Sequence, residues 1–475
     1  MATIQEISSG SLDDFDADGV ADLTRPSDMP FTYNQFISTD IREPVVFSDS
    51  STGGMARFQM DRKGFLSHHS KITFSVVPVD TNKSAYFPIG VGVNSLISRV
   101  VLKSGNGGRV LSETQEFGQL KAYDSMFITG EANKERETYL TQRMINHGSV
   151  YETDPNTKNT NSDAPTYGLE TGREYEGTDL KLLPCNRIDG TSALTKKHSP
   201  VYSVLLGDLC DLFKDQDFPL FLCDEDLFLE VHFQSDSKKR VSVISTQAGF
   251  TAPYLIDQAE CRMIYDSIEY DPDQMDAFRK KANAKGLTFQ YHDYRLTKRT
   301  SATPSTWANL IQNVGGAGRF VDKIVIRIGR DDNNKEKALL NSFYSQHPTT
   351  GTTTLNVRYN DRYEFPIDRS NTALLFQTMK TAEGQVPFIT RQEYSREMPA
   401  TITDRTFEGN QQRASLGGNL HYLAVKPERE ERINNQGIDI ELKGTFPAES
   451  LTLMCWIALR KVARIKDGRL DCYFA

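Results

Sequence analysis

The chain has 475 residues, of which 63 are acidic and 55 are basic, so its formal net charge at pH 7 is −8. A chain of this length exceeds what one ordinary hydrophobic core supports, and we expect two or three domains. The acidic balance argues against sequence-independent wrapping of nucleic acid, which needs a basic surface. No run of about 18 apolar residues predicts a transmembrane helix, and the polar, acidic start does not resemble a secretory signal.

Residues 1–40 are predicted to form an acidic N-terminal arm. The stretch DFDADGVAD, from Asp14 to Asp22, resembles a calcium-binding loop with carboxylates at alternate positions. The twelfth position of such a loop needs a bidentate Glu, but Arg25 stands there and no flanking helical pattern is present. We therefore interpret the stretch as part of the arm and not as a metal site.

Residues 41–240 are predicted to form a first β-domain. The glycines of PIGVGVNSLISRVVLKSGNGG, at 88–108, suggest a nucleotide-binding loop, but Lys103 precedes its glycine and Ser95 stands where a dinucleotide motif needs its third glycine. We interpret the stretch as a short helical turn, a strand and an Asn-Gly hairpin turn. Other predicted elements are strands at 57–60, 71–79 and 226–233, helices at 116–127 and 130–145, a long polar excursion at 147–199 and a linker at 235–259.

Residues 241–475 are predicted to form a second β-domain. It opens with a helix, DPDQMDAFRKKANAKG, that begins after Asp271 and is closed by Gly286. A second excursion is expected at 381–419. The predicted strands, from their alternation and β-branched content, are 352–360, 362–367, 421–426, 438–443 and 451–462.

The two domains repeat one another at an offset of 224 residues. LISRVVLKSG, from Leu96, matches FVDKIVIRIG, from Phe320, and DLFLEVHF at 226–233 matches SLTLMCWI at 450–457. In the second pair the apolar residues alternate with period two, as in half-buried strands. The repeat predicts a duplicated β-domain, with each copy about 200–225 residues long, the size of one decorated β-domain.

The six cysteines are scattered through the chain, and none forms a C-x-x-C pair. Six thiols in 475 residues are too sparse for a disulfide framework, so we expect buried free thiols in a reducing compartment. They are Cys185, Cys210, Cys223, Cys261, Cys455 and Cys472.

No other residue pattern predicts catalysis. His68 and His69 are adjacent and would point to opposite faces of a strand, so we place them in a turn. The basic run at 238–240 is interpreted as a solvated linker, the acidic run at 224–226 as a solvent-facing turn, and Trp456 as a core residue. The sequence lacks G-x-S-x-G, H-E-x-x-H and paired catalytic carboxylate motifs, and we assign no catalytic, cofactor-binding or metal-ligating residue.

The order of these segments resembles that of double jelly-roll major capsid proteins over essentially the whole chain. The likeness is closest to the capsid proteins of polinton-like viruses and virophages. It is carried by IREPVVF from Ile41, the 88–108 stretch, ANKERE from Ala132, LLGDLCDLF from Leu205, FPLFLCDEDLFLEVHF from Phe218, YDPDQMDAF from Tyr270, INNQGIDIEL from Ile433 and the C-terminal DGRLDCYFA.

The resemblance implies a mostly β fold of two tandem eight-stranded jelly rolls with short inserted helices and long loops. It further implies a homotrimer of pseudo-hexagonal outline that contacts neighbouring capsomers, penton and minor capsid proteins in an icosahedral virion assembled inside the infected cell. No cofactor, enzymatic activity or sequence-specific nucleic-acid binding is expected. The alternatives are a two-domain β-sandwich enzyme or lectin acting on carbohydrate, or another virion part such as a penton or spike.

Overall fold

The computed structural model describes the strands and helices of both predicted domains. The described residues are 35–50, 52–78, 85–86, 91–105, 108–124, 127, 140–141, 187–188, 201–214, 216–235, 244–245, 254–301, 310–330, 350–360, 362–368, 372–384, 422–427, 431–445 and 451–475. The calcium-like stretch, the basic run at 238–240 and nearly all of the predicted excursion at 147–199 lie outside them. Within the described part of the chain, no helix has the length and apolar character needed to cross a membrane.

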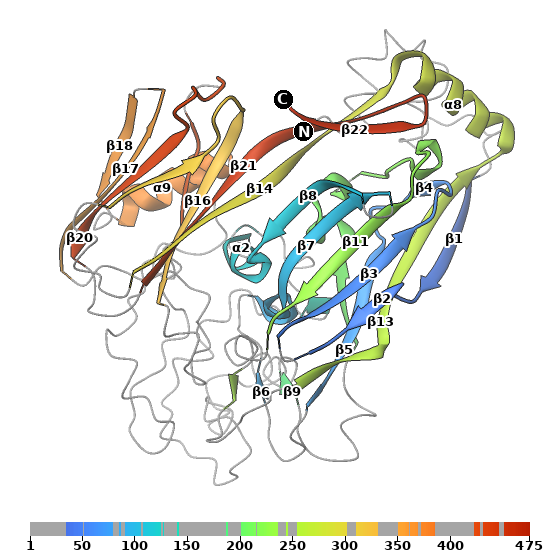
Figure 1. Cartoon of the computed structure of the whole chain (residues 1–475), viewed down its shortest axis with the longest axis horizontal. Coiled ribbons are helices and arrows are strands. Elements are labelled where there is room, and N and C mark those ends of the chain that lie inside the picture. Colours follow the sequence, from blue (N-terminus) through green and yellow to red (C-terminus); the bar gives the residue numbers. More distant parts are fainter. Residues whose placement is uncertain are drawn as a thin grey trace.

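The first unit is a sandwich of two antiparallel sheets (Figure 1). One has the order β1 (Gln35–Arg42), β13 (Tyr254–Tyr270), β5 (Lys71–Pro78) and β10 (Val201–Leu205), with β4 (Phe65–Leu66) also on β13. The other has the order β2 (Val46–Ser48), β3 (Gly54–Met60), β11 (Leu227–Phe233), β7 (Ile97–Ser104) and β8 (Arg109–Gln115). Its remaining elements are β12 (Ile244–Ser245), β6 (Ala85–Tyr86), β9 (Arg187–Ile188), η3 (Gly92–Leu96), α2 (Phe117–Asp124), α6 (Leu206–Leu209), η7 (Asp211–Phe213) and η8 (Leu220–Leu222).

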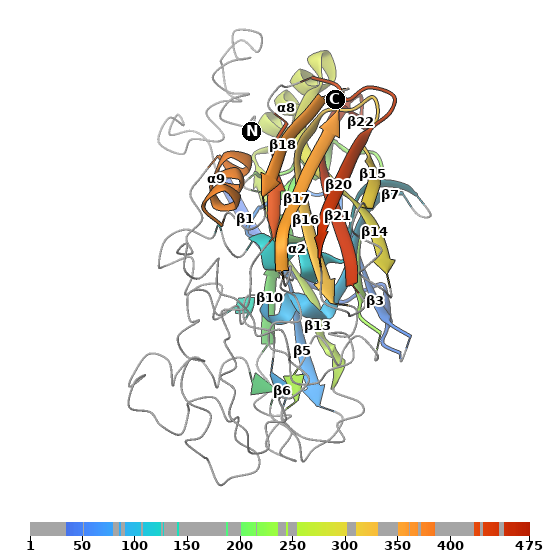
Figure 2. The same ribbon diagram turned by 90° about the vertical axis from the view of Figure 1, so that its left-hand side faces the viewer.

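The second unit is also a two-sheet sandwich, and Figure 2 shows it facing the viewer. One sheet has the order β14 (Leu287–Ser301), β21 (Leu451–Lys466), β16 (Val321–Arg330) and β19 (Leu423–Val425), with β22 (Arg469–Phe474) on β21. The other has the order β15 (Leu310–Gly315), β20 (Ile438–Thr445), β17 (Thr350–Tyr359) and β18 (Arg362–Asp368). Two helices complete the unit, α8 (Pro272–Lys285) before β14 and α9 (Thr372–Glu383) between β18 and β19.

The predicted duplication is visible in the pairing of the strands that carry it. β7 and β16 each pair with the strand from the second repeated segment, β11 and β21, so the order β3-β11-β7-β8 corresponds to β14-β21-β16-β19. Leu229 faces Leu102 in the first unit, and Leu453 faces Ile328 in the second. The first members are 224 residues apart and the second members 226, so the register differs by two residues, a step that keeps every side chain on its face of the sheet.

The described elements confirm several local predictions and revise the domain boundaries. η3 is followed by β7, and the β7–β8 hairpin turns at the Asn-Gly segment. α8 ends at Gly286, whose φ of 83° favours glycine. However, β1 and β13 both belong to the first sandwich. By strand pairing, the first unit therefore begins at Gln35 and ends at Tyr270, which differs from the predicted boundaries after residues 40 and 240.

Two hydrophobic clusters form the cores, and each receives side chains from both units. The first holds the inward faces of the first sandwich, such as Ala56, Phe58 and Met60 on β3, together with Phe289 on β14 and Ile465 on β21. The second holds β16, β20 and the start of β21 together with residues of α2. β14 and β21 are long enough to contribute one half of each strand to each core, so the two sandwiches share a continuous hairpin-like pair.

Candidate functional site

The most extensively bonded part of the structure is the junction between the two units. β8 is the last strand of its sheet and lies beside β14 (Figure 1). An edge strand presents a row of backbone N–H and C=O groups without ladder partners, and natural proteins cover or pair such rows. At this junction, side chains of β14 and β21 bond to the backbone of β8.

Two buried charged side chains of the second unit hold that backbone. Asp293 and Lys461 are 3% and 6% exposed, and their carboxylate and ammonium groups are 2.8 Å apart. Lys461 Nζ and the Tyr291 hydroxyl each donate to the carbonyl oxygen of Leu111 at 2.8 Å, and the Glu113 N–H donates to Asp293 at 3.0 Å. Because both charges are paired and hydrogen-bonded, their burial is tolerated and fixes β8 against the second unit.

A second charged network crosses the junction at His292 on β14. Its ring nitrogens lie 3.0 Å from Asp211, at the start of η7, and 3.1 Å from Asp322 on β16. Burial lowers the pKa of His292, but the hydrogen bonds to the two carboxylates outweigh burial and raise the pKa to about 9. Burial raises the pKa of Asp211, and its hydrogen bond with His292 outweighs that effect and lowers the pKa to about 2. A charged imidazole therefore joins the units at neutral pH, with Arg460 pairing the other side of Asp322.

α2 of the first unit packs into the core of the second. The hydroxyl of Tyr123 donates to Glu383 at the end of α9, and the same carboxylate accepts from Lys323 at 2.7 Å. Burial, and then the nearby carboxylate, raise the pKa of Tyr123 well above its ordinary value. The indole of Trp456 is fully buried and donates to the carbonyl oxygen of Gln115 at 3.0 Å. These contacts make the two sandwiches one packed body.

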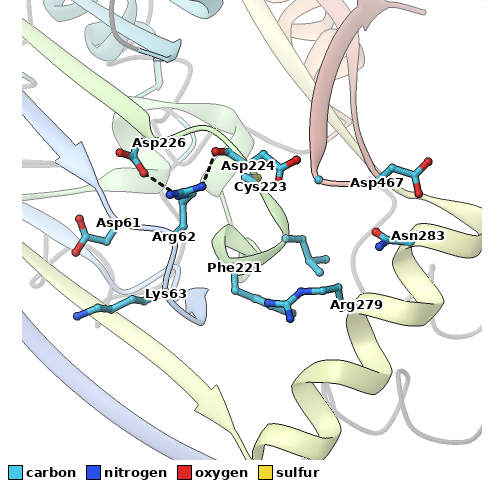
Figure 3. Close-up of a pocket in the computed structure, with 12 residues that line it drawn as sticks. Asp61, Arg62, Lys63, Phe221, Cys223, Asp224, Asp226, Arg279, Asn283 and Asp467 are labelled. Carbon is cyan, nitrogen blue, oxygen red and sulfur yellow. Dashed lines mark hydrogen bonds and ion pairs between the residues drawn. The ribbon is translucent and has the colours of Figure 1, made fainter.

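A cleft of about 780 Å³ lies where the first unit, α8 and the β21–β22 turn meet. In Figure 3, Arg279 and Asn283 extend from α8 toward the segment that carries Phe221 and Asp224. On the opposite wall, Arg62 pairs with Asp226 at 3.2 Å and donates to the backbone carbonyl of Asp224 at 2.6 Å. The lining carries both signs of charge and its central guanidinium is already paired, so we interpret the cleft as part of the junction and assign it no chemical step.

The β21–β22 turn closes this cleft through one close backbone approach. The N–H of Asp224 donates to the carbonyl oxygen of Gly468 at 2.7 Å. Gly468 has a φ of +78°, and a Cβ placed on it would run into the carboxylate of Asp224. Glycine is therefore required both by the backbone conformation and by the contact.

The described cysteines match the predicted buried thiols. Cys210, Cys223, Cys261 and Cys455 are buried and free, and Cys472 is free and partly buried. Burial raises the pKa of the Cys210, Cys223 and Cys261 thiols to about 12, which makes them poor nucleophiles. Cys185 lies outside the described residues.

The other singled-out residues take structural positions. His68 and His69 lie in a turn, as predicted, and His68 bonds to Asp217 at 2.9 Å. The acidic run at 224–226 forms the predicted turn before β11, but its carboxylates have partners, with Glu225 accepting from Ser104 at 2.6 Å. Trp456 is a core residue, as predicted. Across the described ranges, no group of three or more His, Cys, Asp or Glu residues is placed to hold a metal ion.

The most important junction residues were not predicted from the sequence. The run from Phe289 to Asp293 alternates with period two, and Phe289 and Tyr291 are buried. Asp293 therefore occupies an inward position where an apolar residue is expected. A lone charge at such a position is the signal that could have indicated a buried pair, although Lys461 lies too far along the chain for the sequence to identify it.

Comparison with solved structures decides the fold. No family model and no curated protein matches the sequence. VP54 of PBCV-1, fitted into a reconstruction of the virophage Sputnik, superposes with a TM-score of 0.52 at 10% identity, over 94% of this chain and 98% of that one. The Faustovirus major capsid protein gives a TM-score of 0.51 at 9% identity, over 91% of both chains.

This chain has the double jelly-roll fold of viral major capsid proteins. The Sputnik virophage structure gives a similar result, with a TM-score of 0.51 at 10% or lower identity, 9%, over 94% of this chain and 90% of that one. The match spans both sandwiches, so the predicted fold class, two tandem jelly rolls with few helices, is confirmed. At this level of identity the double jelly-roll comparison establishes architecture, while the activity of the chain is a separate inference.

Proposed function

We propose that this chain is the major capsid protein of a DNA virus and that its role is structural, not enzymatic. Three copies associate as a homotrimer of pseudo-hexagonal outline, and the trimers tile an icosahedral shell in the virion. The observation that carries the proposal is the extent of the fold match, which covers 94% of this chain and 98% of a capsid protein chain.

The junction supports this role physically. A shell protein must hold two rolls at a constant spacing, because three two-roll chains approximate six equal positions only if the spacing within a chain equals the spacing between chains. The buried Asp293–Lys461 pair, the His292 network and the α2 contacts fix that spacing. Two stacked sheets with protected edges supply stiff walls.

The partners follow from the proposed role. The chain contacts its own copies, then neighbouring capsomers, and at the vertices and inner surface penton and minor capsid proteins. Assembly takes place inside the infected host cell. With a net charge of −8, the chain is poorly suited to neutralise a genome by itself, so no direct sequence-specific binding of nucleic acid is part of the proposal.

The proposal is tested by the mass of the purified full chain in light scattering. A stable species of three times 53.5 kDa is expected, together with larger hexagonal arrays in electron micrographs at high concentration. A monomer that hydrolyses or binds polysaccharide would instead favour the carbohydrate-active alternative. A fivefold oligomer would favour a penton.

A further inference from the structure

The outer edge of the first unit carries an unusual concentration of exposed apolar side chains. Among the described residues, eleven large hydrophobic side chains are exposed, and five of them lie between residues 36 and 46. They are Phe36, Ile37 and Ile41 on β1 and Val45 and Val46 at β2, with exposures of 58%, 66%, 62%, 61% and 41%. A cluster of this kind marks an interaction surface more often than an isolated exposed residue does.

The backbone of this edge is also available. β1 ends its sheet, and among the described strands it pairs with β13 alone. Figure 1 places it on the side of the first unit that faces away from the second unit. Eight residues of strand with an open side are a template for pairing with another strand, and this edge has no proline within Gln35–Arg42 to prevent it.

The sequence of β1 indicates which strand fits. Paired residues of antiparallel strands point to the same face of the sheet, so two identical strands related by a twofold axis pair about a residue and not between two residues. Centring the pair on Thr39 places Ile37 of one copy opposite Ile41 of the other, on both sides of the axis. These two isoleucines and Thr39 share one face of β1, and all three are exposed.

The opposite face of β1 is complementary in the same register. Phe36 comes opposite Arg42 of the second copy, and Ser38 comes opposite Asp40, so no like charges meet. Centring on Asp40 would instead bring two carboxylates together, and centring on Ser38 would place Asp40 against Phe36. Both alternatives are less favourable because directly opposed like charges, or a carboxylate against an aromatic ring, weaken a cross-strand pair.

We propose that β1 is a homotypic docking strand, which joins two copies of this chain by antiparallel β1–β1 pairing centred on Thr39. A twofold contact cannot close a threefold ring, so this contact links one trimer to the next. The inference deepens the proposed function and rests on it for that setting, but the pairing itself is measured independently of trimer formation.

The direct test is Thr39→Cys in the full chain, oxidised with copper–phenanthroline and resolved on a non-reducing gel. Two copies of residue 39 would face one another within about 6 Å, inside disulfide reach, and a covalent dimer of twice 53.5 kDa is expected. The matched control is Phe36→Cys. In the proposed register the two copies of residue 36 are displaced by six residues, about 20 Å, and should cross-link no more than the wild type does.

A second test uses charge on the same face. The double variant Ile37→Lys, Ile41→Lys should weaken association between trimers at least about tenfold in sedimentation, because two buried apolar contacts per copy are replaced by like charges. Ile311→Lys, at a position that is 59% exposed on β15, is the control and should assemble like the wild type. Both variants alter exposed side chains, so trimers of both should remain folded.

The outcomes separate this inference from the proposed function. Trimers that form normally while Thr39→Cys cross-links no better than Phe36→Cys overturn the inference alone. Cross-linking at residue 39 in a protein that never forms trimers supports β1 pairing and counts against the capsid proposal. Cross-linking that occurs only after removal of residues 1–34 would show that the chain's own N-terminal segment occupies β1, which overturns the inference.

Discussion

Replacing Asp293 with alanine would expose how much the junction depends on one buried charge pair. Lys461, which is 6% exposed, would keep its ammonium group but lose the carboxylate 2.8 Å away, and the Glu113 N–H would lose its acceptor. Breaking a buried pair by removing one partner typically costs about 3–5 kcal/mol. At roughly 2 °C for each kcal/mol in a large domain, the melting temperature should fall by about 6–10 °C.

The assay is thermal unfolding followed by intrinsic fluorescence, with two matched variants. Arg295→Ala removes a cation that is 53% exposed and 3.9 Å from the same carboxylate, and it should cost no more than about 1 kcal/mol because exposed pairs contribute little. The double variant Asp293→Leu, Lys461→Met removes both charges. It should be more stable than Asp293→Ala, because an uncompensated buried charge is worse than an apolar pair of similar volume.

Two results would refute this reasoning. If Asp293→Ala melts within 1–2 °C of the wild type, roughly one kcal/mol or less, the pair does not hold the junction. If the double variant loses as much stability as the two single losses added together, the residues act independently. Either outcome would require another account of how β8 is fixed against the second unit.

Three further predictions concern the junction and the arm. Because the folded pKa of His292 is about 9 against 6.5 for the ordinary group, its stabilisation is complete below pH 6.5 and is lost as pH rises through 9, so the wild type should lose melting temperature across that window while His292→Gln shows a flatter profile. Gly468→Ala should destabilise more than Gly318→Ala, since both glycines have positive φ but only the first meets Asp224, and equal losses by calorimetry would contradict the proposed close approach. Removing residues 1–34 should leave soluble trimers that form shells poorly, and shells at full yield in electron micrographs would reject a role for the arm in assembly.

Local alternation and turn chemistry were sufficient to predict much of the fold from the sequence. β7, β11 and β21 carry period-two apolar residues, and α8 has a proline at its start and a glycine at its end. The duplication at an offset of 224 residues added long-range information, because it indicated that β7 and β16 occupy equivalent places.

Elements whose inward face is partly polar were missed. β13 begins at Tyr254, inside the predicted linker, and β14 carries the buried Asp293 among its apolar residues. α9 was also not predicted, and its end overlaps the excursion expected from residue 381. In each case the deciding contact comes from residues far along the chain, such as Lys461, and local periodicity contains no information about it.

The central claim is that two fused jelly rolls allow three chains to occupy six nearly equivalent positions. Electron cryomicroscopy of the purified oligomer tests it most directly. The account predicts a threefold ring of three chains in which six sandwiches stand at nearly equal spacing. A ring of any other symmetry, or a threefold ring whose six sandwiches are clearly unequal in spacing, would contradict it.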